Sequence, residues 1–479
     1  MNLATELENL LGPSTVETSE AIRSQHSHGE SYAGAVLPDV VVFPRRTAQV
    51  AKLMSFASAN GVPVTPVAAN SSLEGQTVPV RGGVSLDMTH LDQLLESRPE
   101  DLLAVVQPGI TYPKLNERLR RSGLFFPIDP GAHASIGGMV STNASGTAAV
   151  RYGTTSDYVL GLEVVTPTGQ ILRLGNRARK SSSGYDLCAL FTGAEGTLGV
   201  ITEVTLKLVG LPEAASAARV PFADAFAATT YVTRLIQAGV PVARCELVDE
   251  HSIRACNAYS GTNFPEQMTI FLEFHGNEAG VAAETELARA LANASGALAF
   301  EAATDAAERE RLWEARHTMF FASNAAHPGM ESLVTDVAVP ISELPNALTA
   351  ALAECAEAGF AANLVGHVGD GNFHLTLYLP EDAAAREQAQ GIVDRMTRRA
   401  LAVGGTATGE HGVGLRKLKY MEEEHGAALE LMRSIKQMLD PASIMNPGKK
   451  LPDPHAPSAT QPTSNRDDTK GSSAAQRSY

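Results

Sequence analysis

Short apolar segments alternate with segments of helical periodicity from Asp39 to about Leu211, and this alternation constrains the fold more than any other feature of the sequence. Residues 39–44 and 62–67 each predict a strand. Between them we expect a helix that Thr47 caps and Gly61 ends. Its apolar residues at the helical spacing are Val50, Leu53, Met54 and Ala57.

Two later segments of this region repeat the pattern. Thr111 and Pro113 are expected to open a helix that ends at Gly123. Residues 162–174 predict a hairpin, because the turn-forming sequence Thr-Pro-Thr-Gly interrupts an apolar run. Many short strands mixed with helices indicate an α+β protein.

The composition changes near residue 214, where Ala-rich amphipathic helices begin, separated by strands such as residues 268–274 and 333–339. We therefore divide the chain into a helical lead-in, a first domain, a second domain and a tail. The predicted bounds are residues 1–36, 37–213, 214–452 and 453–479. The tail is rich in Pro, Ser, Thr, Asp and Gln, and we predict that it is disordered because it cannot bury enough apolar surface.

The acidic composition limits what the chain can bind. Its formal net charge is −15, whereas nucleic-acid phosphates require clustered Lys and Arg, so a nucleic-acid partner is excluded. The first residues lack the features of a signal peptide, and no uncharged apolar stretch reaches the ~18 residues of a transmembrane helix. With four scattered cysteines and no CxxC, we expect a cytoplasmic protein with reduced thiols. Peripheral contact with a membrane and homodimer formation stay open.

Two histidines, His367 and His374, flank a segment that predicts a hairpin turn (Gly369–Asn372). A two-residue turn at Asp370-Gly371 makes the histidines cross-strand partners that can share a metal ion. Hydrogen-bonded interior histidines are the alternative. About 36 residues later, Glu410 and His411 add a carboxylate and a third imidazole in a glycine-rich loop. This addition favours a metal site with His367, His374 and Glu410 as ligands.

Three segments of the first domain have the composition of cofactor-binding loops: residues 65–75, 130–146 and 193–203. They are rich in Gly, Ser and Thr, so their backbone can approach a ligand closely and point N–H groups at it. Each segment alone is more typical of an ordinary loop. No G-x-G-x-x-G follows the first strand, which argues against a Rossmann dinucleotide site.

These three loops in order, with the histidine motifs and the later sequence Asn446-Pro447-Gly448-Lys449, resemble the FAD-linked oxidases with a vanillyl-alcohol-oxidase-type (PCMH-type) flavin domain. Within them the chain is most similar to the D-lactate dehydrogenase (cytochrome) and glycolate oxidase large-subunit branch. The resemblance covers about Pro38 to Pro452. It implies a PCMH-type FAD-binding domain of two α/β subdomains. An α+β substrate domain with an antiparallel sheet and a C-terminal helical segment would follow.

The resemblance also implies non-covalent FAD, held by the three loops and by Asn446. The first loop departs from the family in Ala68 and Asn70, where glycines are usual. The residues expected to contact FAD are Ala69, Asn70, Ser71, Ser72, Leu73, Gly75, Pro130, Gly131, Ala132, Ser135, Ile136, Gly137, Gly138, Asn143, Ser145, Gly146, Glu195, Gly196, Gly199, Val200, Ile201 and Asn446.

For the chemistry, the family implies a carboxylate-binding arginine at Arg316 and a proton acceptor at His411. Without the family, a surface helix arginine is the simpler interpretation of Arg316. The expected reaction is oxidation of a D-2-hydroxy acid, foremost D-lactate, by hydride transfer to flavin N5, with zinc or manganese orienting the substrate. A cytochrome, a quinone or an electron-transfer flavoprotein would receive the electrons.

Three alternatives remain at this stage. The substrate can instead be glycolate or D-2-hydroxyglutarate. The residues His367, His374 and Glu410 can serve a metal-dependent hydrolase. The altered first loop also fits a catalytically silent flavoprotein or scaffold.

Overall fold

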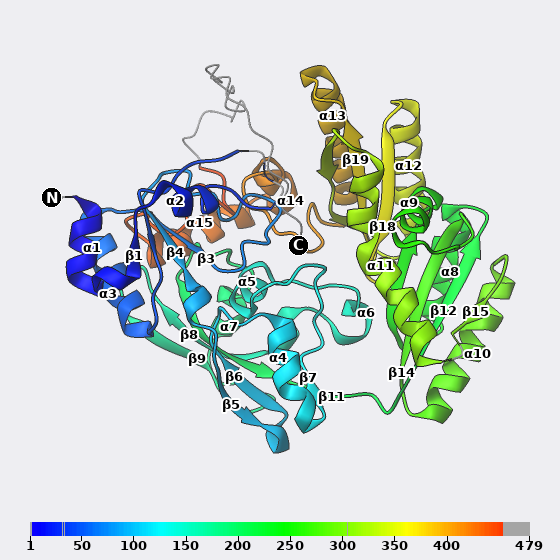
Figure 1. Cartoon of the computed structure of the whole chain (residues 1–479), viewed down its shortest axis with the longest axis horizontal. Coiled ribbons are helices and arrows are strands. Elements are labelled where there is room, and N and C mark those ends of the chain that lie inside the picture. The colour runs from blue at the N-terminus through cyan, green and yellow to red at the C-terminus, as the bar shows by residue number, and fades with distance from the viewer. Residues whose placement is uncertain (1, 31, 33, 304, 454–479) are drawn as a thin grey trace.

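The computed structural model describes residues 2–30, 32, 34–303 and 305–453. Residues 454–479, for which the sequence predicts disorder, lie outside the described residues. Figure 1 shows two units side by side. One contains the elements up to β11 (Val209–Gly210), and the other runs from β12 (Ala214–Phe222) to α13 (Ala383–Ala402).

A four-stranded sheet with the strand order β1-β2-β4-β3 begins the first unit. β2, β4 and β3 are parallel, whereas β1 comes from the lead-in and pairs antiparallel with β2, a strand that the sequence analysis did not predict. Apolar side chains of α1 and α3 pack with this sheet in one core. The bounds are α1 Leu3–Leu11, β1 Val16–Glu17, α2 Glu20–Gln25, β2 Val40–Val42, α3 Thr47–Asn60, β3 Val64–Val67 and β4 Val84–Asp87.

The predicted helix after the first strand is confirmed, with one correction at its start. Gly61 ends α3 in the left-handed conformation, with φ 65°. The N-cap residue is Arg46 rather than Thr47, because the Thr47 hydroxyl donates to the Glu163 carboxylate at 2.9 Å. The side chain that was expected to cap the helix therefore links it to the second sheet.

The second sheet has five antiparallel strands in the order β5-β6-β10-β8-β9. β8 and β9 form the hairpin predicted at residues 162–174, and α4 ends near Gly123 as expected. The bounds are β5 Leu94–Arg98, β6 Leu103–Val106, α4 Tyr112–Leu119, β7 Leu124–Phe125, α5 Ile136–Thr142, α6 Ala149–Tyr152, β8 Val159–Val165, β9 Ile171–Gly175, α7 Leu187–Phe191 and β10 Val200–Lys207. The short strands β7 and β11 pair separately.

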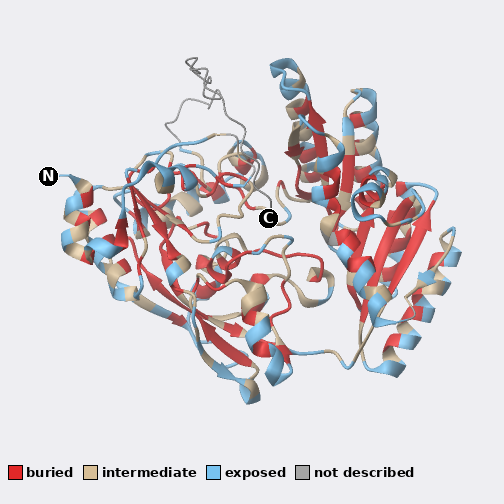
Figure 2. Ribbon diagram, in the orientation of Figure 1, coloured by how far each residue is buried: buried red, intermediate tan, exposed pale blue. Residues whose placement is uncertain are grey.

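The second unit contains an antiparallel sheet in the order β15-β12-β14-β13-β18-β19-β16, with β17 paired to β19. α8, α10, α12 and α13 pack on one face, and α9 and α11 pack on part of the other. Figure 2 shows these strands buried between helices whose outer surfaces are exposed. The bounds are α8 Ala225–Gln237, β13 Val242–Val248, α9 Glu250–Ser260, β14 Met268–Gly276, α10 Glu278–Ala294, β15 Glu301–Ala302, α11 Ala306–Ala326, β16 Glu331–Val334, β17 Val337–Ala338, α12 Leu344–Glu357, β18 Ala361–Gly366 and β19 Asn372–Leu379.

Residues 333–339 were predicted as one strand, but the structure divides them into β16 and β17. The interruption falls at Thr335 and Asp336, whose side chains are buried and form hydrogen bonds with β19 residues. These polar contacts take the place of a continuous ladder.

The C-terminal segment returns to the first unit (Figure 1), where α15 (Ala428–Leu439) packs on the core of the second sheet and α14 (Met421–His425) packs on α15. Ile444 and Met445 join the core of the first sheet, and the Asn446 N–H donates to the Val64 carbonyl at 2.8 Å. The loop that carries Glu410 and His411 therefore connects the two units. Within the described part of the chain, no helix is long and apolar enough to cross a membrane.

Candidate active site

The hairpin predicted around the two histidines is confirmed, but its register is not. β18 and β19 pair antiparallel, and the cross-strand partner of His374 is Val365, not His367. The connection runs over residues 367–371 and contains a 3-10 turn, rather than the expected two-residue turn. Gly369 packs so closely on α6 that a β-carbon there would lie 2.6 Å from Val150 Cγ2, and this packing fits the longer connection.

The two imidazoles nevertheless meet, with ring centroids 5.3 Å apart. In β19, Phe373 and Leu375 point into the core beneath α12 and α13, so His374 projects from the opposite face. Glu410 joins them: its Oε1 lies 3.0 Å from His367 Nε2 and 3.1 Å from His374 Nε2. The sequence-predicted metal ligands are therefore brought together, with one candidate ligand atom from each within 4.8 Å of the others.

The second nitrogen of each ring indicates its tautomer. His374 Nδ1 lies 3.1 Å from the Thr335 carbonyl, and His367 Nδ1 lies 2.7 Å from Glu246 Oε1. Because both partners are acceptors, Nδ1 of each ring carries a proton, and Nε2 is the nitrogen left for a second proton or a metal ion beside Glu410. A proton or a metal ion at this position offsets the charge of the carboxylate.

The same charges control the protonation of the ligands in the absence of a metal. Burial alone would lower the pKa of His367, but the carboxylates of Glu246 and Glu410 outweigh it and hold the pKa well above its usual value. Burial would raise the pKa of Glu410, yet His367 and His374 keep it well below normal. Protons and a metal ion therefore compete for one site.

His411, the expected proton acceptor, is stacked on His374 with ring centroids 4.9 Å apart. Its Nδ1 faces two buried acids, Glu74 Oε1 at 3.4 Å and Asp336 Oδ2 at 4.0 Å. Burial would lower the pKa of His411, but Asp336 and Glu74 together raise it. Glu74 lies in the first predicted FAD loop, and sequence reasoning did not single it out.

Asp336 organises the loop that carries Glu410 and His411. Its Oδ2 accepts hydrogen bonds from the backbone N–H groups of both residues, at 3.1 and 2.9 Å. Lys417 Nζ donates to the same oxygen at 3.1 Å and to the Asp336 carbonyl at 2.9 Å. Burial would raise the pKa of Asp336, but Lys417 and the neighbouring histidines keep it well below normal.

Arg316 lies on α11 with a buried side chain that is paired to Glu246, 2.5 Å from Nη2 to Oε2. It is not the surface arginine of the simpler interpretation. Glu246 is fully buried in β13 and was missed by the sequence analysis, because β13 also carries Arg244 and reads as a strand with one polar face. It connects Arg316 to His367.

The first loop has the backbone that its sequence requires. Asn70 adopts φ 55°, which asparagine tolerates, whereas Ala68 is not among the described residues with positive φ. Asn70 Nδ2 donates to the His28 carbonyl at 2.9 Å. Ala69, Ser71, Leu73 and Gly75 lie in the same irregular segment.

The second loop contributes to both halves of the site. Pro130, Gly131 and Ala132 are irregular, and Ser135 caps α5, which begins with Ile136, Gly137 and Gly138 and ends at Asn143 with φ 53°. Gly146 lies so close to the Asp129 carbonyl that a β-carbon would be 2.4 Å away. Ser145 Oγ donates to Glu410 Oε2 at 2.8 Å, so this loop directly contacts a candidate metal ligand.

The third loop is held by contacts with two segments that follow the Glu410–His411 loop. Glu195 adopts φ 52°, and its buried carboxylate accepts the N–H groups of Val413 and Gly414 at 2.7 and 2.8 Å. Asn446 Nδ2 donates to the Glu195 carbonyl at 2.8 Å, while Gly196 follows in the same turn. The remaining predicted FAD contacts of this loop are Gly199, Val200 and Ile201. Gly199 directly precedes β10, and Val200 and Ile201 begin this strand and pair with β8.

A cavity of about 380 Å³ lies at this junction and reaches Glu410. Its walls come from α5, α7, the third loop, the 408–412 segment and the C-terminal segment. The lining residues are Thr142, Asn143, Leu190, Thr192, Gly193, Ala194, Thr197, Leu198, Thr408, Gly409, Glu410, Gly412, Met432, Ile435, Lys450 and Leu451.

Buried polar atoms without a protein partner indicate where ligands fit, because each costs about 1–3 kcal/mol when it is left unpaired. In and near the first loop these atoms are Thr65 Oγ1, Asn70 Oδ1, Ser72 Oγ and Thr77 Oγ1, and the hydroxyls among them suit a pyrophosphate. In the second unit they include Arg316 Nε, which suits a carboxylate, whereas His374 Nε2 has the Glu410 carboxylate 3.1 Å away and suits a metal ion shared with it. The residues present therefore fit both FAD and a metal.

Comparison with known proteins identifies the family. Residues 38–175 match the family described as FAD binding domain, and residues 211–450 match FAD linked oxidases, C-terminal domain. The chain belongs to the FAD-linked oxidase family. This confirms the expected family and FAD cofactor, and it makes the chain an enzyme of that family.

Several curated relatives of this FAD-linked oxidase extend over most of its length. A probable mitochondrial D-lactate dehydrogenase of Danio rerio is 40% identical over 94% of this chain and 91% of its own. A mitochondrial D-lactate dehydrogenase (cytochrome) of Arabidopsis thaliana is 41% identical over 90% and 77%. Glycolate oxidase subunit GlcD of Bacillus subtilis is 32% identical over 93% and 95%.

Solved structures agree on the fold. Substrate-bound p-cresol methylhydroxylase superposes with a TM-score of 0.76, at 16% identity over 94% of this chain and 96% of its own. 4-Ethylphenol oxidase from Gulosibacter chungangensis gives a TM-score of 0.74, at 18% identity over 94% and 97%. The PCMH-type α+β architecture expected from the sequence is thereby confirmed.

Proposed function

We propose that this FAD-linked oxidase converts a D-2-hydroxy acid, foremost D-lactate, to the 2-oxo acid. The observation that carries the proposal is the contact of Ser145, in an FAD loop, with Glu410, on which His367 and His374 also converge. A metal-ligand set with a candidate base beside it thus adjoins the predicted flavin site. The D-lactate dehydrogenases among the relatives support the choice of substrate.

Each part of the reaction has a residue to perform it. Arg316 binds the substrate carboxylate, using donors that Glu246 leaves free. His411 Nδ1 faces Glu74, so Nε2 takes the hydroxyl proton. His367, His374 and Glu410 hold a zinc or manganese ion. When bound, this ion acidifies and orients the hydroxyl, and FAD supplies the hydride acceptor.

The three loops and Asn446 hold FAD without a covalent bond. Electrons then pass to an external acceptor, for which a cytochrome, a quinone and an electron-transfer flavoprotein are the candidates. The Arabidopsis thaliana relative is a D-lactate dehydrogenase (cytochrome), which favours a cytochrome as the acceptor.

A second candidate function is glycolate oxidation, which the Bacillus subtilis relative favours. A comparison of D-lactate, glycolate and D-2-hydroxyglutarate as substrates distinguishes the two functions. A metal-dependent hydrolase would need no flavin, so an FAD-binding domain over residues 38–175 argues against it.

The test is anaerobic mixing of the purified FAD protein with D-lactate, L-lactate, glycolate and D-2-hydroxyglutarate, with the flavin absorbance recorded in time. We expect D-lactate to bleach the flavin fastest. Bleaching by glycolate alone would select the second candidate, and no bleaching by any of the four would refute oxidation of 2-hydroxy acids.

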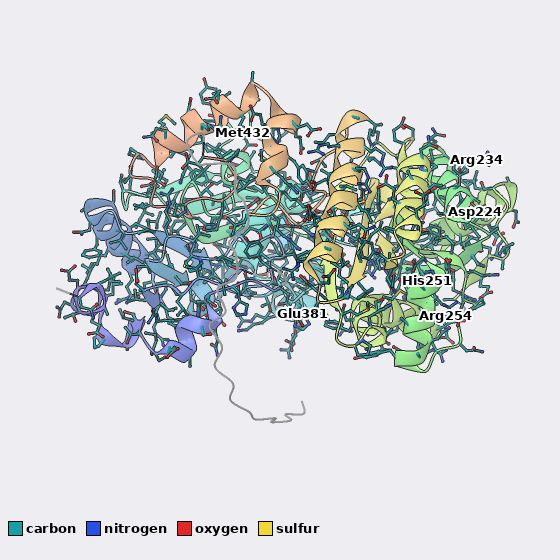
Figure 3. All side chains as sticks on the ribbon, turned by 90° about the horizontal axis from the view of Figure 1, so that it is seen from above. Asp224, Arg234, His251, Arg254, Glu381 and Met432 are labelled. Carbon is teal, nitrogen blue, oxygen red and sulfur yellow. The ribbon has the colours of Figure 1, made fainter. Side chains whose placement is uncertain are left out.

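Arg316→Leu provides a variant for the same assay. It should raise the D-lactate concentration needed for half-maximal bleaching by about 10–100-fold, because the loss of a charged hydrogen bond costs roughly 1.5–3 kcal/mol. Arg254→Leu, on the exposed side of α9 (Figure 3), is the matched control and should leave this concentration unchanged.

A further inference from the structure

The carboxylate of Glu246 holds two functional side chains from different elements. Oε1 accepts from His367 Nδ1 at 2.7 Å, and Oε2 accepts from Arg316 Nη2 at 2.5 Å. His367 belongs to the turn between β18 and β19, Arg316 to α11 and Glu246 to β13. The side chain of Glu246 is 0% exposed, so protein groups alone balance its charge.

Stability alone is a weak explanation for such an arrangement. Withdrawing a carboxylate from water costs several kcal/mol, and well-packed apolar residues commonly replace a buried ion pair without loss of stability. In β13 (Val242–Val248), Cys245 and Leu247 pack into the core, whereas Glu246 lies on the opposite face of the strand together with Arg244. The two partners of Glu246 are the candidate metal ligand and the candidate carboxylate-binding residue, which points to the site rather than to the core.

Resting on the proposed function, we propose that Glu246 is the positioning residue that couples the metal to the substrate carboxylate. One oxygen fixes the Nδ1–H tautomer of His367, so that Nε2 faces Glu410, 3.0 Å from its Oε1. The other oxygen occupies a single Nη of Arg316, and the Nε of that arginine stays buried without a protein partner. The Glu246 carboxylate therefore orients both the metal-binding nitrogen of His367 and the N–H donors of Arg316.

A neutral amide at this position cannot serve both partners, because the NH₂ of Glu246→Gln must face a donor on one side. For the FAD-loaded variant we expect the dissociation constant of Zn²⁺ or Mn²⁺ to rise about 10–100-fold. The KM for D-lactate should rise with the metal held saturating, because Arg316 loses its anchor. The FAD content should be that of the natural protein.

The experiment measures metal affinity by competition with a fluorescent chelator and then the KM at saturating metal. Glu381→Gln, an exposed glutamate before α13 (Figure 3), is the matched control. Glu246→Leu leaves both Arg316 and His367 without their shared carboxylate, so it should lower the melting temperature and lose metal affinity even more strongly than Glu246→Gln.

The outcomes distinguish this inference from the proposed function. Increases in both the metal dissociation constant and the KM support the coupling. If the natural protein takes up metal and is bleached by D-lactate, while Glu246→Gln changes only the melting temperature, the carboxylate is structural and the inference is overturned. If the natural protein takes up neither ion, the proposed metal site fails and the coupling fails with it.

Discussion

Replacement of Asp336 by Asn tests the physical basis of the site most severely. Asp336 accepts from Thr408 Oγ1 at 2.8 Å, from the Glu410 and His411 N–H groups and from Asn372 Nδ2, and it pairs with Lys417. Asn keeps the volume but removes the charge. The NH₂ group of the asparagine would also face N–H and O–H groups that now donate to the Asp336 carboxylate, so two donors would point at each other.

The size of the effect follows from these contacts. Removing one member of a buried ion pair typically costs about 3–5 kcal/mol. Lys417 keeps the Asp336 carbonyl at 2.9 Å and Glu74 at 3.6 Å, so we expect the lower end of that range. A loss of about 3 kcal/mol lowers the melting temperature by roughly 6–12 °C in a unit of this size. Flavin reduction by D-lactate should also slow, because the loop carrying His411 loses its anchor.

Thermal unfolding measured by circular dichroism checks this value. The matched control is Asp224→Asn at the N-cap of α8 (Figure 3), which should be nearly neutral because Asn and Asp cap helices equally well. If Asp336→Asn melts within 2 °C of the natural protein, the loss of stability is under about 1 kcal/mol, and the charge of Asp336 does not hold the loop in place.

The pH dependence gives an independent check of the same residue. The pKa of Asp336 is held well below that of an unfolded Asp, about 3.9. Its contribution to stability is therefore fully present above roughly pH 4 and is lost as the pH falls through the folded value. The difference in melting temperature between the natural protein and Asp336→Asn should shrink as the pH falls below about 4. An equal difference at pH 7 and pH 3 would contradict the assignment of the charge.

Three further outcomes are expected. His411→Ala should keep FAD and metal but slow anaerobic flavin reduction about 10²–10⁴-fold, because it loses the proton acceptor. The control His251→Ala, on exposed α9 (Figure 3), should not slow it. An equal rate in both variants would show that His411 is not the base. His374→Ala should abolish metal uptake, measured by metal analysis, without releasing FAD, and unchanged bound metal would reject the ligand set. Asn70→Val should weaken FAD binding in a titration with the apoprotein, because a β-branched residue does not tolerate φ 55°, and an unaltered affinity would show that this conformation is unimportant for FAD.

Local sequence patterns predicted much of the fold because their causes are local. Gly61 ends α3 since it adopts φ 65° without strain, and the residues at 166–169 turn the β8–β9 hairpin. The β18–β19 register was not predictable in the same way. Its five-residue connection depends on packing against distant segments: a β-carbon on Gly369 would meet Val150, and one on Gly371 would lie 2.1 Å from the Val339 carbonyl.

The candidate site shows the same division. His367, His374, Glu410 and His411 stand out in the sequence because imidazoles and a carboxylate between glycines carry chemistry by themselves. Glu74 and Glu246 do not stand out, because their burial depends on partners far along the chain, such as Arg316 for Glu246. Their roles follow only once the fold has brought these partners together.

The most direct test of the account is the rate of anaerobic flavin reduction by D-lactate in metal-stripped protein, measured before and after Mn²⁺ or Zn²⁺ is restored. We predict that stripped protein remains yellow for far longer than the reconstituted protein, and that adding metal restores rapid bleaching without any change in FAD content. Bleaching at the full rate in stripped protein, with less than one metal ion per hundred chains by metal analysis, would contradict the central claim that His367, His374 and Glu410 present the hydroxy acid to the flavin through a metal.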